Sequence, residues 1–397
     1  MKENLKDLRQ SEENVATAEA KLNALGRDAK GQLETARRNL LGELQGLASA
    51  RSFAGDPAGA IDAFDKEARL REQFYEPPIV GDPRMDLKKI DASKATDAIA
   101  AIVEAAKNRQ VVILNEAHHV EFDRVFAMRL ARELRKIGYE YLACETFTID
   151  DIHVLSKGYV AKNTGVYSEE PSYVNFLTDA IAGGWKFVSY EPDGNGDIRE
   201  YGMAANLVDR IFKKSPSAKV FIYVGYSHAQ KLPVSRTKTD SSKMAAQLKR
   251  LTGIDPLTIN QTTLYAHYDT AQQFRYYEHA VKKLRGTTPA VLVTSNGKGI
   301  KLGIDDQAYD FEVVHPRYTM DPGTRRPEWM SLTALGNLKG REIPVEMLPK
   351  TGRRLIYAYR IHSPRDAAPF DVVILNAGDP TPELMLPEGD FTLEYED

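Results

Sequence analysis

Four β-type segments of the 397-residue chain each end with an acidic or histidine residue. Two apolar runs lead into Asn-Glu-Ala-His at 115–118 and Gly-Tyr-Ser-His at 225–228, and two shorter runs at 139–145 and 186–191 each end on glutamate. In a parallel α/β sheet the carboxyl ends of the strands face the ligand crevice, so such residues can converge on one polar site. The candidate catalytic residues are Glu116, His118, Glu145 and His228.

A histidine beside a carboxylate is suited to general base catalysis. His118 could take a proton from water while Glu116 or Glu145 orients the imidazole and stabilises its charged form. His228 would then stabilise developing negative charge. The alternative is structural, with Glu116 and His118 capping the following helix or pairing with a neighbouring strand.

Residues next to these positions are candidate substrate contacts. Arg124 begins the helix after the Glu-His segment and could bind a carboxylate or phosphate through two parallel hydrogen bonds. An arginine on a helix face is otherwise solvated or paired with an acid. Gly225 allows close approach of backbone or ligand at its strand end. The candidate substrate-binding residues are Glu121, Arg124, Glu191 and Tyr226.

Four other residues favour structural roles. His267 and His315 follow β-type runs and are expected to be structural, since histidine is commonly half-buried. Trp329 is expected to pack against the core. Cys144 lies in a buried-looking strand beside Glu145, a setting that raises a thiol pKa and argues against a nucleophile.

Several familiar catalytic motifs are absent from the sequence. It contains no Gly-x-Ser-x-Gly elbow, no phosphate loop ending in Gly-Lys-Ser/Thr and no His-Glu-x-x-His helix. The loop after the first apolar strand also lacks a dinucleotide glycine fingerprint. These absences disfavour a serine hydrolase, an NTPase and a Rossmann dehydrogenase.

The alternation of helical and strand patterns from residue 93 onward predicts the fold class α/β, with a doubly wound, mostly parallel sheet. The strand runs show no polar alternation, which is typical of strands covered by helices on both faces. The predicted α/β core domain spans residues 93–304 and carries the Glu/His site.

Three flanking regions complete the predicted organisation. Residues 1–75 predict a helical hairpin or coiled-coil-like segment, because leucines and valines recur at heptad spacing. Residues 76–92 form a Pro-rich linker. Residues 305–397 predict a small β-rich C-terminal region that ends in a β-hairpin turned at 388–390. The N-terminal helices would serve packing, a homo-oligomer or a protein partner.

Composition limits the classes of partner and compartment. A net charge of −3 and a pI near 6.3 give no general attraction to nucleic acid. A single cysteine allows no internal disulfide. No apolar run is long enough to predict a transmembrane segment. As written, the chain is expected to be cytoplasmic, or periplasmic or secreted if a signal peptide was removed. The expected partner is a small-molecule substrate.

The Glu/His segments also carry a resemblance. Residues 112–118, 143–145 and 225–228 resemble the superfamily that joins erythromycin-esterase-like hydrolases, ChaN-like haem-binding proteins and TraB/Tiki-type proteins. The first motif of that superfamily is Gly-Glu-x-His, and here Asn115 stands where glycine is expected. The second motif, Gly-x-x-His, matches at 225–228. The resemblance covers roughly residues 95–300.

Each branch of this superfamily implies a different chemistry. The esterase branch implies a hydrolase whose Glu and His residues activate water. The Tiki branch implies a divalent metal, for which the candidate ligands are Glu116, His118, Glu145 and His228. The ChaN branch implies haem binding without catalysis, with His119, Tyr226 or His228 as candidate axial ligands.

The sequence therefore predicts a hydrolase that uses a Glu/His site, with or without a metal ion, against an ester, lactone or amide. A ChaN-like haem- or metal-binding protein without catalysis is the alternative. A non-catalytic interaction module that recruits a partner through its N-terminal helices is the second alternative.

Overall fold

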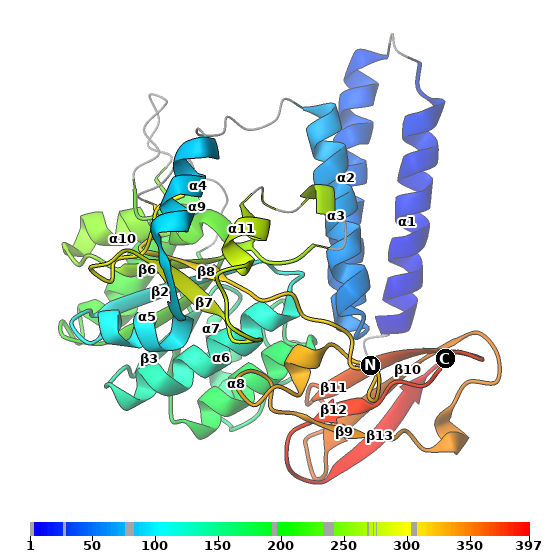
Figure 1. Cartoon of the computed structure of the whole chain (residues 1–397). Coiled ribbons are helices and arrows are strands. Elements are labelled where there is room, and N and C mark those ends of the chain that lie inside the picture. Colours follow the sequence, from blue (N-terminus) through cyan, green and yellow to red (C-terminus); the bar gives the residue numbers. More distant parts are fainter. Residues whose placement is uncertain are drawn as a thin grey trace.

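A computed structural model describes the chain except for residues 1–3, 27–28, 76–82, 193–196, 233–241, 268–269, 273, 275 and 303–307. Three parts are visible in Figure 1: a group of N-terminal helices, a central α/β layer structure and small C-terminal sheets. The figure also shows the N-terminal helices standing beside the central part, with their lower ends on the C-terminal sheets.

The central sheet has eight strands in the order β1-β7-β8-β6-β2-β5-β3-β4. Its pairs are parallel except for those that β7 makes with β1 and β8. The strands are β1 (Lys94–Asp97), β2 (Val111–Glu116), β3 (Tyr141–Cys144), β4 (Lys186–Val188), β5 (Val220–Gly225), β6 (Leu257–Leu264), β7 (Ala290–Val293) and β8 (Phe311–Val314). The predicted α/β fold class is confirmed.

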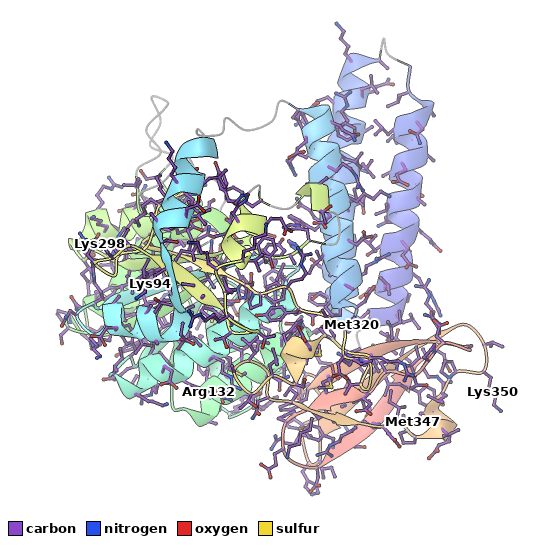
Figure 2. The ribbon with its side chains drawn as sticks, viewed as in Figure 1. Lys94, Arg132, Lys298, Met320, Met347 and Lys350 are labelled. Carbon is purple, nitrogen blue, oxygen red and sulfur yellow. The ribbon has the colours of Figure 1, made fainter. Side chains whose placement is uncertain are left out.

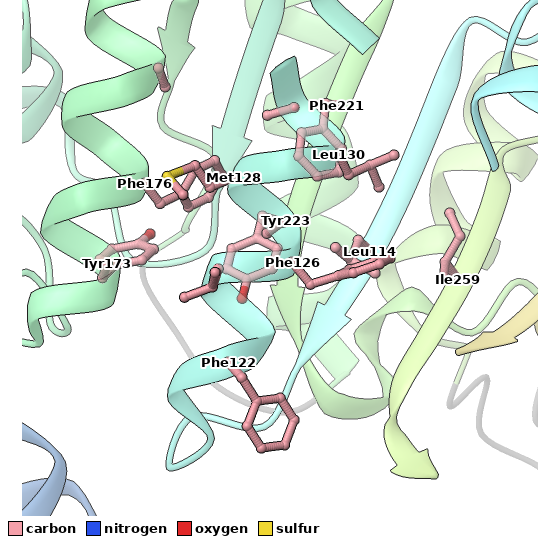
Figure 3. Close-up of a cluster of buried hydrophobic side chains, with 14 of the residues drawn as sticks. Leu114, Phe122, Phe126, Met128, Leu130, Tyr173, Phe176, Phe221, Tyr223 and Ile259 are labelled. Atoms are coloured by element: carbon pink, nitrogen blue, oxygen red, sulfur yellow. The ribbon is translucent and has the colours of Figure 1, made fainter. Parts of the chain in front are cut away.

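Alternate residues of the buried strands pack into two different cores. On one face Leu114 and Tyr223 contact a cluster that includes α5 (Ala98–Ala106), α6 (Glu121–Lys136) and α8 (Pro171–Ala182). Figure 3 shows this cluster, with Phe126 and Leu130 of α6 near the strand residues.

On the other face of the sheet Ile113 and Ile222 belong to a second cluster. Its helices are α9 (Asp197–Leu207), which continues as a π-helical turn, and α10 (Met244–Thr252). Helices on both faces explain why β5 and the first four residues of β2 are apolar. Shorter helices flank the sheet: α7 (Ile149–Leu155) and α11 (Tyr277–Val281).

The N-terminal region contains three described helices, where the sequence suggested a hairpin or a coiled coil. They are α1 (Asn4–Ala24), α2 (Lys30–Phe53) and α3 (Pro57–Phe74). Asp56 begins α3 by accepting a hydrogen bond from the Gly59 amide at 2.9 Å. Leucines of α1 and α2 share a core with residues of the C-terminal sheet, so the helices are docked on the remainder of the chain.

Part of the predicted linker is helical. Residues 76–82 lie outside the described residues, and residues 83–92 form α4 (Pro83–Ala92). Pro83 stands at the first position of this helix. The backbone amide at that position makes no hydrogen bond within a helix, so proline loses nothing there, and its fixed φ suits the helix. The last of the three prolines that suggested an extended segment therefore lies at a helix start.

The C-terminal region is β-rich, with two corrections to the prediction. Its strands are β9 (Lys339–Arg341), β10 (Arg353–Arg360), β11 (Asp371–Asn376), β12 (Leu384–Leu386) and β13 (Phe391–Glu396). The terminal β-hairpin prediction is wrong, because β12 pairs with β9 while β13 pairs with β10. In addition, β8 was expected in this region but belongs to the central sheet.

Three of the four residues expected to be structural are buried, and His267 is partly exposed. Trp329 is enclosed near Phe122, and His315 has no exposed surface. Burial raises the pKa of the Cys144 thiol, which agrees with the prediction that it is no nucleophile. Charged side chains such as Lys94, Arg132, Lys298 and Lys350 lie at the outside of the molecule (Figure 2). No described helix is both long and apolar enough to span a bilayer.

The docking of the N-terminal helices predicts a sharp effect at Gly55. Its φ is +72°, and a Cβ there would lie 1.9 Å from the Val372 carbonyl oxygen in β11. Gly55→Ala must therefore move the turn between α2 and α3 away from the C-terminal sheet. We expect it to lower the free energy of unfolding, measured in urea, by more than the roughly 1–2 kcal/mol that the left-handed conformation alone costs.

Gly253→Ala is the matched control. Gly253 has φ +73°, and no atom lies within 4 Å of its Cβ position, so only the conformational cost applies. Equal losses in the two variants would mean that the Gly55 contact does not hold the parts together.

A buried Asp–His pair lies between α6 and the sheet. Asp123 Oδ1 is 3.7 Å from His315 Nε2, and neither side chain has exposed surface. Burial raises the pKa of Asp123 well above its usual value, and burial lowers the pKa of His315 to about 3. The folded pair therefore holds one proton, on Asp123, across mildly acidic pH.

Asp123→Asn should expose the pH dependence of His315. In the wild type the folded and unfolded forms of the pair each bind one proton between about pH 4 and 6.5, so stability from this pair is flat there. In the variant, His315 takes up a proton in the unfolded state as the pH is lowered from 7 to 5, whereas burial keeps it unprotonated in the folded state. The stability therefore falls over this pH range. We expect an additional loss on the order of 2 kcal/mol by urea unfolding. A parallel loss in the wild type would contradict this account.

Candidate functional site

The sheet topology brings the sequence motifs together. The register of β2 and β5 pairs Glu116 with Gly225. On the other side of β5, the amide of Glu145 donates to the Tyr223 carbonyl at 3.1 Å. All four candidate catalytic residues consequently lie at the same carboxyl edge of the sheet.

Glu116 and His118 form a hydrogen-bonded dyad. His118 Nδ1 lies 2.8 Å from Glu116 Oε1, and the Glu116 side chain is buried. Burial favours the neutral acid, but Arg124 and His118 outweigh it and hold the Glu116 pKa well below its usual value. The carboxylate is therefore ionised and is positioned to accept from Nδ1–H, an arrangement that leaves Nε2 as the nitrogen that can act as a base.

Arg124 supports this dyad from inside the protein. Its Nε donates to Glu116 at 3.0 Å and its Nη1 donates to Glu170 at 2.8 Å, while Nη2 reaches the carbonyl of His118 at 2.9 Å. The arginine has no exposed surface. It is thus placed to hold Glu116, which differs from the predicted substrate contact and agrees with the expected alternative of pairing with an acid.

Gly225 lies directly against the His118 ring. A Cβ on Gly225 would lie 2.6 Å from His118 Nε2 and 2.9 Å from Glu145 Oε2. The Gly225 amide also donates to Glu145. The absence of a side chain on Gly225 lets the imidazole and the second carboxylate converge, which is the physical reason for glycine here.

The remaining predicted residues form a network around an arginine. Arg199 donates to Glu145 at 2.6 Å, to Glu191 at 3.1 Å, and its Nη1 lies 3.0 Å from His228 Nε2. Burial raises the pKa of Glu191, while the pKa of Arg199 is raised by the two carboxylates although burial opposes this. Arg199 is a permanent cation at the centre of the cluster.

His228 is held by a second carboxylate. Its Nδ1 lies 2.9 Å from Glu200, which also accepts from Lys243 at 3.2 Å and from the amide of Met244 at 2.8 Å. Burial of Glu200 is outweighed by His228 and Lys243, which lower its pKa. Both nitrogens of His228 therefore face protein groups, so it positions its neighbours instead of offering a free nitrogen.

The donor set does not fit a metal ion as arranged. Arg199 lies between Glu145, Glu191 and His228, where a cation bound by these groups would have to sit. Throughout the ranges that the structure describes, no group of three or more His, Cys, Asp or Glu side chains could hold a metal ion. A guanidinium supplies the positive charge that these carboxylates require.

His119 is poorly placed as a haem ligand. It is 2% exposed and stacks on Phe64 with ring centroids 3.7 Å apart. Its two ring nitrogens lie 3.4 Å from the hydroxyls of Tyr226 and Tyr265. Iron would have to displace these contacts on both sides of the ring, so the geometry does not favour His119 as an axial ligand.

A cavity of about 890 Å³ opens beside the dyad. His118, Tyr167 and Tyr226 line its inner end, and Tyr167 stacks on the His118 ring at 4.5 Å. The opposite wall comes from helices α2 and α3. Of the predicted substrate-binding residues, Tyr226 lines this cavity. Glu121 is buried, accepts from Ser52 at 3.4 Å and lines a smaller cavity of about 240 Å³.

Several residues at the site were not found from the sequence. Arg199 and Glu200 begin a helix that gave no catalytic pattern, and Glu170 and Tyr167 belong to a loop region that precedes α8. Phe64 of α3 comes from a part of the chain that the sequence assigned to packing or partners. A signal existed only for Glu170, which precedes a proline at a helix start, as capping residues do.

Asn115 stands where the motif that the chain resembles has glycine, and its side chain makes several contacts. Its Nδ2 donates to the carbonyl of Tyr226 at 3.0 Å and to Asn260 at 2.7 Å, and its Oδ1 accepts from the Gln261 amide at 2.8 Å. Tyr226 has φ +44°, an uncommon conformation for tyrosine. Asn115 therefore helps to fix the backbone of Tyr226 at the cavity.

The close packing at Gly225 predicts a specific effect of Gly225→Ala. The added methyl group would push the His118 ring from its place between Tyr167 and Tyr226. We expect the carbon and proton NMR shifts of the His118 ring to change. The control is Gly31→Ala, because no atom lies within 4 Å of a Cβ at Gly31. An unchanged His118 signal in Gly225→Ala would refute the contact.

Comparisons with known proteins give limited similarity. No protein-family model matches the chain, and no curated protein does. The type III effector HopBA1 is 13% identical, with a TM-score of 0.37, over 57% of this chain and 96% of its own. A structure described as "Bacterial protein toxins" is 17% identical, with a TM-score of 0.31, over 60% of this chain and 48% of its own. RRSP, a MARTX toxin effector domain from Vibrio vulnificus, is 18% identical, with a TM-score of 0.29, over 54% of this chain and 44% of its own.

Proposed function

We propose that this protein is a hydrolase in which the Glu116–His118 dyad activates water against an ester, lactone or amide. The observation that carries the proposal is the ionised, buried Glu116 bonded to Nδ1 of a His118 that lines a large cavity. Water activation needs two parts: a base that reaches a cavity, and a carboxylate that orients this base. The resemblance of residues 112–118 and 225–228 to the erythromycin-esterase-like proteins supports the same class.

The proposed reaction assigns a step to each of these groups. Nε2 of His118 takes a proton from water while the water oxygen forms a bond to the substrate carbonyl carbon. Glu116 stabilises the imidazolium that results, and Arg124 keeps Glu116 ionised. The imidazolium then returns the proton to the departing oxygen or nitrogen as the carbon–heteroatom bond breaks.

Glu145 is placed to hold the attacking water. Its Oε2 and His118 Nε2 approach each other over Gly225, because both lie within 2.9 Å of the position that a Gly225 Cβ would occupy. Arg199 and the Gly225 amide fix the carboxylate. In this proposal Glu145 accepts one water hydrogen while His118 accepts the other.

Two tyrosines are the proposed donors for the oxyanion. Burial raises the pKa values of Tyr167 and Tyr226, so both phenols remain protonated at neutral pH and can donate. Both residues line the cavity next to His118. A hydroxyl in such a preorganised position stabilises the negative charge that develops in the tetrahedral intermediate.

The decisive experiment measures hydrolysis of p-nitrophenyl acetate and p-nitroacetanilide by the wild type and by two dyad variants. His118→Ala removes the base and is expected to lower kcat/KM by about 10²–10⁴-fold. Glu116→Gln keeps the shape but removes the orienting charge, and a loss of up to about 10⁴-fold is expected. His153→Ala, on the exposed side of α7, should retain wild-type activity.

Thermal unfolding of each variant separates loss of chemistry from loss of fold. Wild-type turnover in His118→Ala, with its fold intact, would refute the proposal. Activity that disappears on dialysis against EDTA and returns with zinc would also contradict the arrangement, because Arg199 occupies the space between the carboxylates.

A further inference from the structure

The cavity beside His118 continues along the N-terminal helices. A second cavity of about 620 Å³ shares Gly42, Gln45, Arg71 and Tyr75 with the first. Along α2 the first cavity begins at Ser49 and the second ends near Glu34. Because a helix rises 1.5 Å per residue, this wall is about 20 Å long. The two cavities form one elongated groove, hereafter the α2/α3 groove, with His118 at its inner end.

The chemistry of the groove changes along its length. Next to His118 it is lined by Phe64, Tyr167 and Tyr226, with Ala48 and Ala68 from the helices. Farther out the side chains are polar. They include Gln45, Arg71 and Tyr75, followed by Arg38 and Glu34. A molecule that fills the groove must therefore be apolar near its reacting group and polar at its distant end.

The floor of the groove depends on two glycines in α2. Gly42 and Gly46 are one turn apart, and both line the cavity. No atom lies within 4 Å of a Cβ placed on either of them, so neither glycine is required by packing within the fold. Glycine in the middle of a helix is less favourable than other residues. What these glycines provide is open space in the groove.

The charged side chains of the wall are already fixed in place. Glu67 is buried and accepts from Gln45 at 3.0 Å and from Arg71 Nε at 3.1 Å. Half of the Arg71 side chain remains exposed. The guanidinium is thus anchored at one edge and open at the other, where it can meet an anionic or polar group of a ligand.

We propose that the α2/α3 groove determines the substrate specificity of the active site and takes an elongated amphipathic substrate, such as an ester of a linear long-chain acid that carries a polar or anionic group at its far end. The apolar chain lies over Gly42 and Gly46, and a polar end reaches Arg71. This inference rests on the proposed hydrolase function for the position of the reacting carbonyl, but the groove itself can be tested by binding.

The experiment replaces Gly46 by leucine, whose Cβ would have no atom within 4 Å and whose side chain would occupy the groove. Gly46→Leu should bind dansylated undecanoic acid at least tenfold more weakly than the wild type, as measured by fluorescence. It should lower kcat/KM for p-nitrophenyl decanoate at least tenfold while leaving p-nitrophenyl acetate within about twofold, because the short ester does not extend over α2. Gly42→Leu is a second variant with the same expected effect.

Gly31→Leu is the control on the same helix. It too has open space around its Cβ position, but Gly31 does not line either cavity. All three variants should keep or raise the melting temperature, because leucine favours the helix more than glycine does. His118→Ala should bind the dansylated acid like the wild type while losing turnover.

The outcomes separate the two proposals. One outcome is that the wild type binds the acid, Gly46→Leu does not bind it, and neither protein hydrolyses any ester. This result would support the groove proposal and refute the hydrolase proposal. If Gly46→Leu binds the acid as tightly as the wild type, or hydrolyses decanoate as fast, the groove proposal is overturned whatever the activity on acetate.

Discussion

The ion pairs of Arg124 with Glu116 and Glu170 are the constraint on which the site depends. Three charges from β2, α6 and the start of α8 are enclosed together with almost no contact with water. Removing one partner of such a group leaves an uncompensated charge in the interior, which costs several kcal/mol. The pairing therefore ties the strand, the two helices and the ionisation of Glu116 into one arrangement. The same carboxylate orients the His118 ring. Arg124 therefore contributes both to the packing of the fold and to the geometry of the proposed catalytic dyad.

The sequence predicted the strands and helices most accurately where the apolar residues show a clear pattern. The predicted strand at 111–116 agrees with β2 residue for residue, and the apolar runs correctly indicated helices on both faces of the sheet. Because parallel strands end at one edge, the convergence of Glu116, His118, Glu145 and His228 followed from the strand assignments alone. These are local patterns combined with one general rule of topology.

Other features depend on pairings that a single sequence does not encode locally. β12 and β13 are separated by a turn-like Glu-Gly-Asp segment, yet each pairs with a strand farther away, since β9 and β10 already present their edges. Arg199 is recognisable only after Glu145, Glu191 and His228 are placed around it. The role of α2 and α3 at the cavity was likewise invisible, because helices that bury one face give the same pattern whether or not another part of the chain completes a binding site.

Asn115 has a consequence for how relatives of this chain can be detected. A search pattern that demands glycine before Glu-x-His passes over it, although the amide side chain connects the backbone of Tyr226 with Asn260 and the Gln261 amide. A glycine in its place would leave these groups to water, which needs room and several polar partners inside the protein. The departure from the motif is thus accompanied by Asn260 and Gln261 on the adjacent strand. A signature that pairs residue 115 with those two positions describes the hydrogen-bonded unit better than the short motif does.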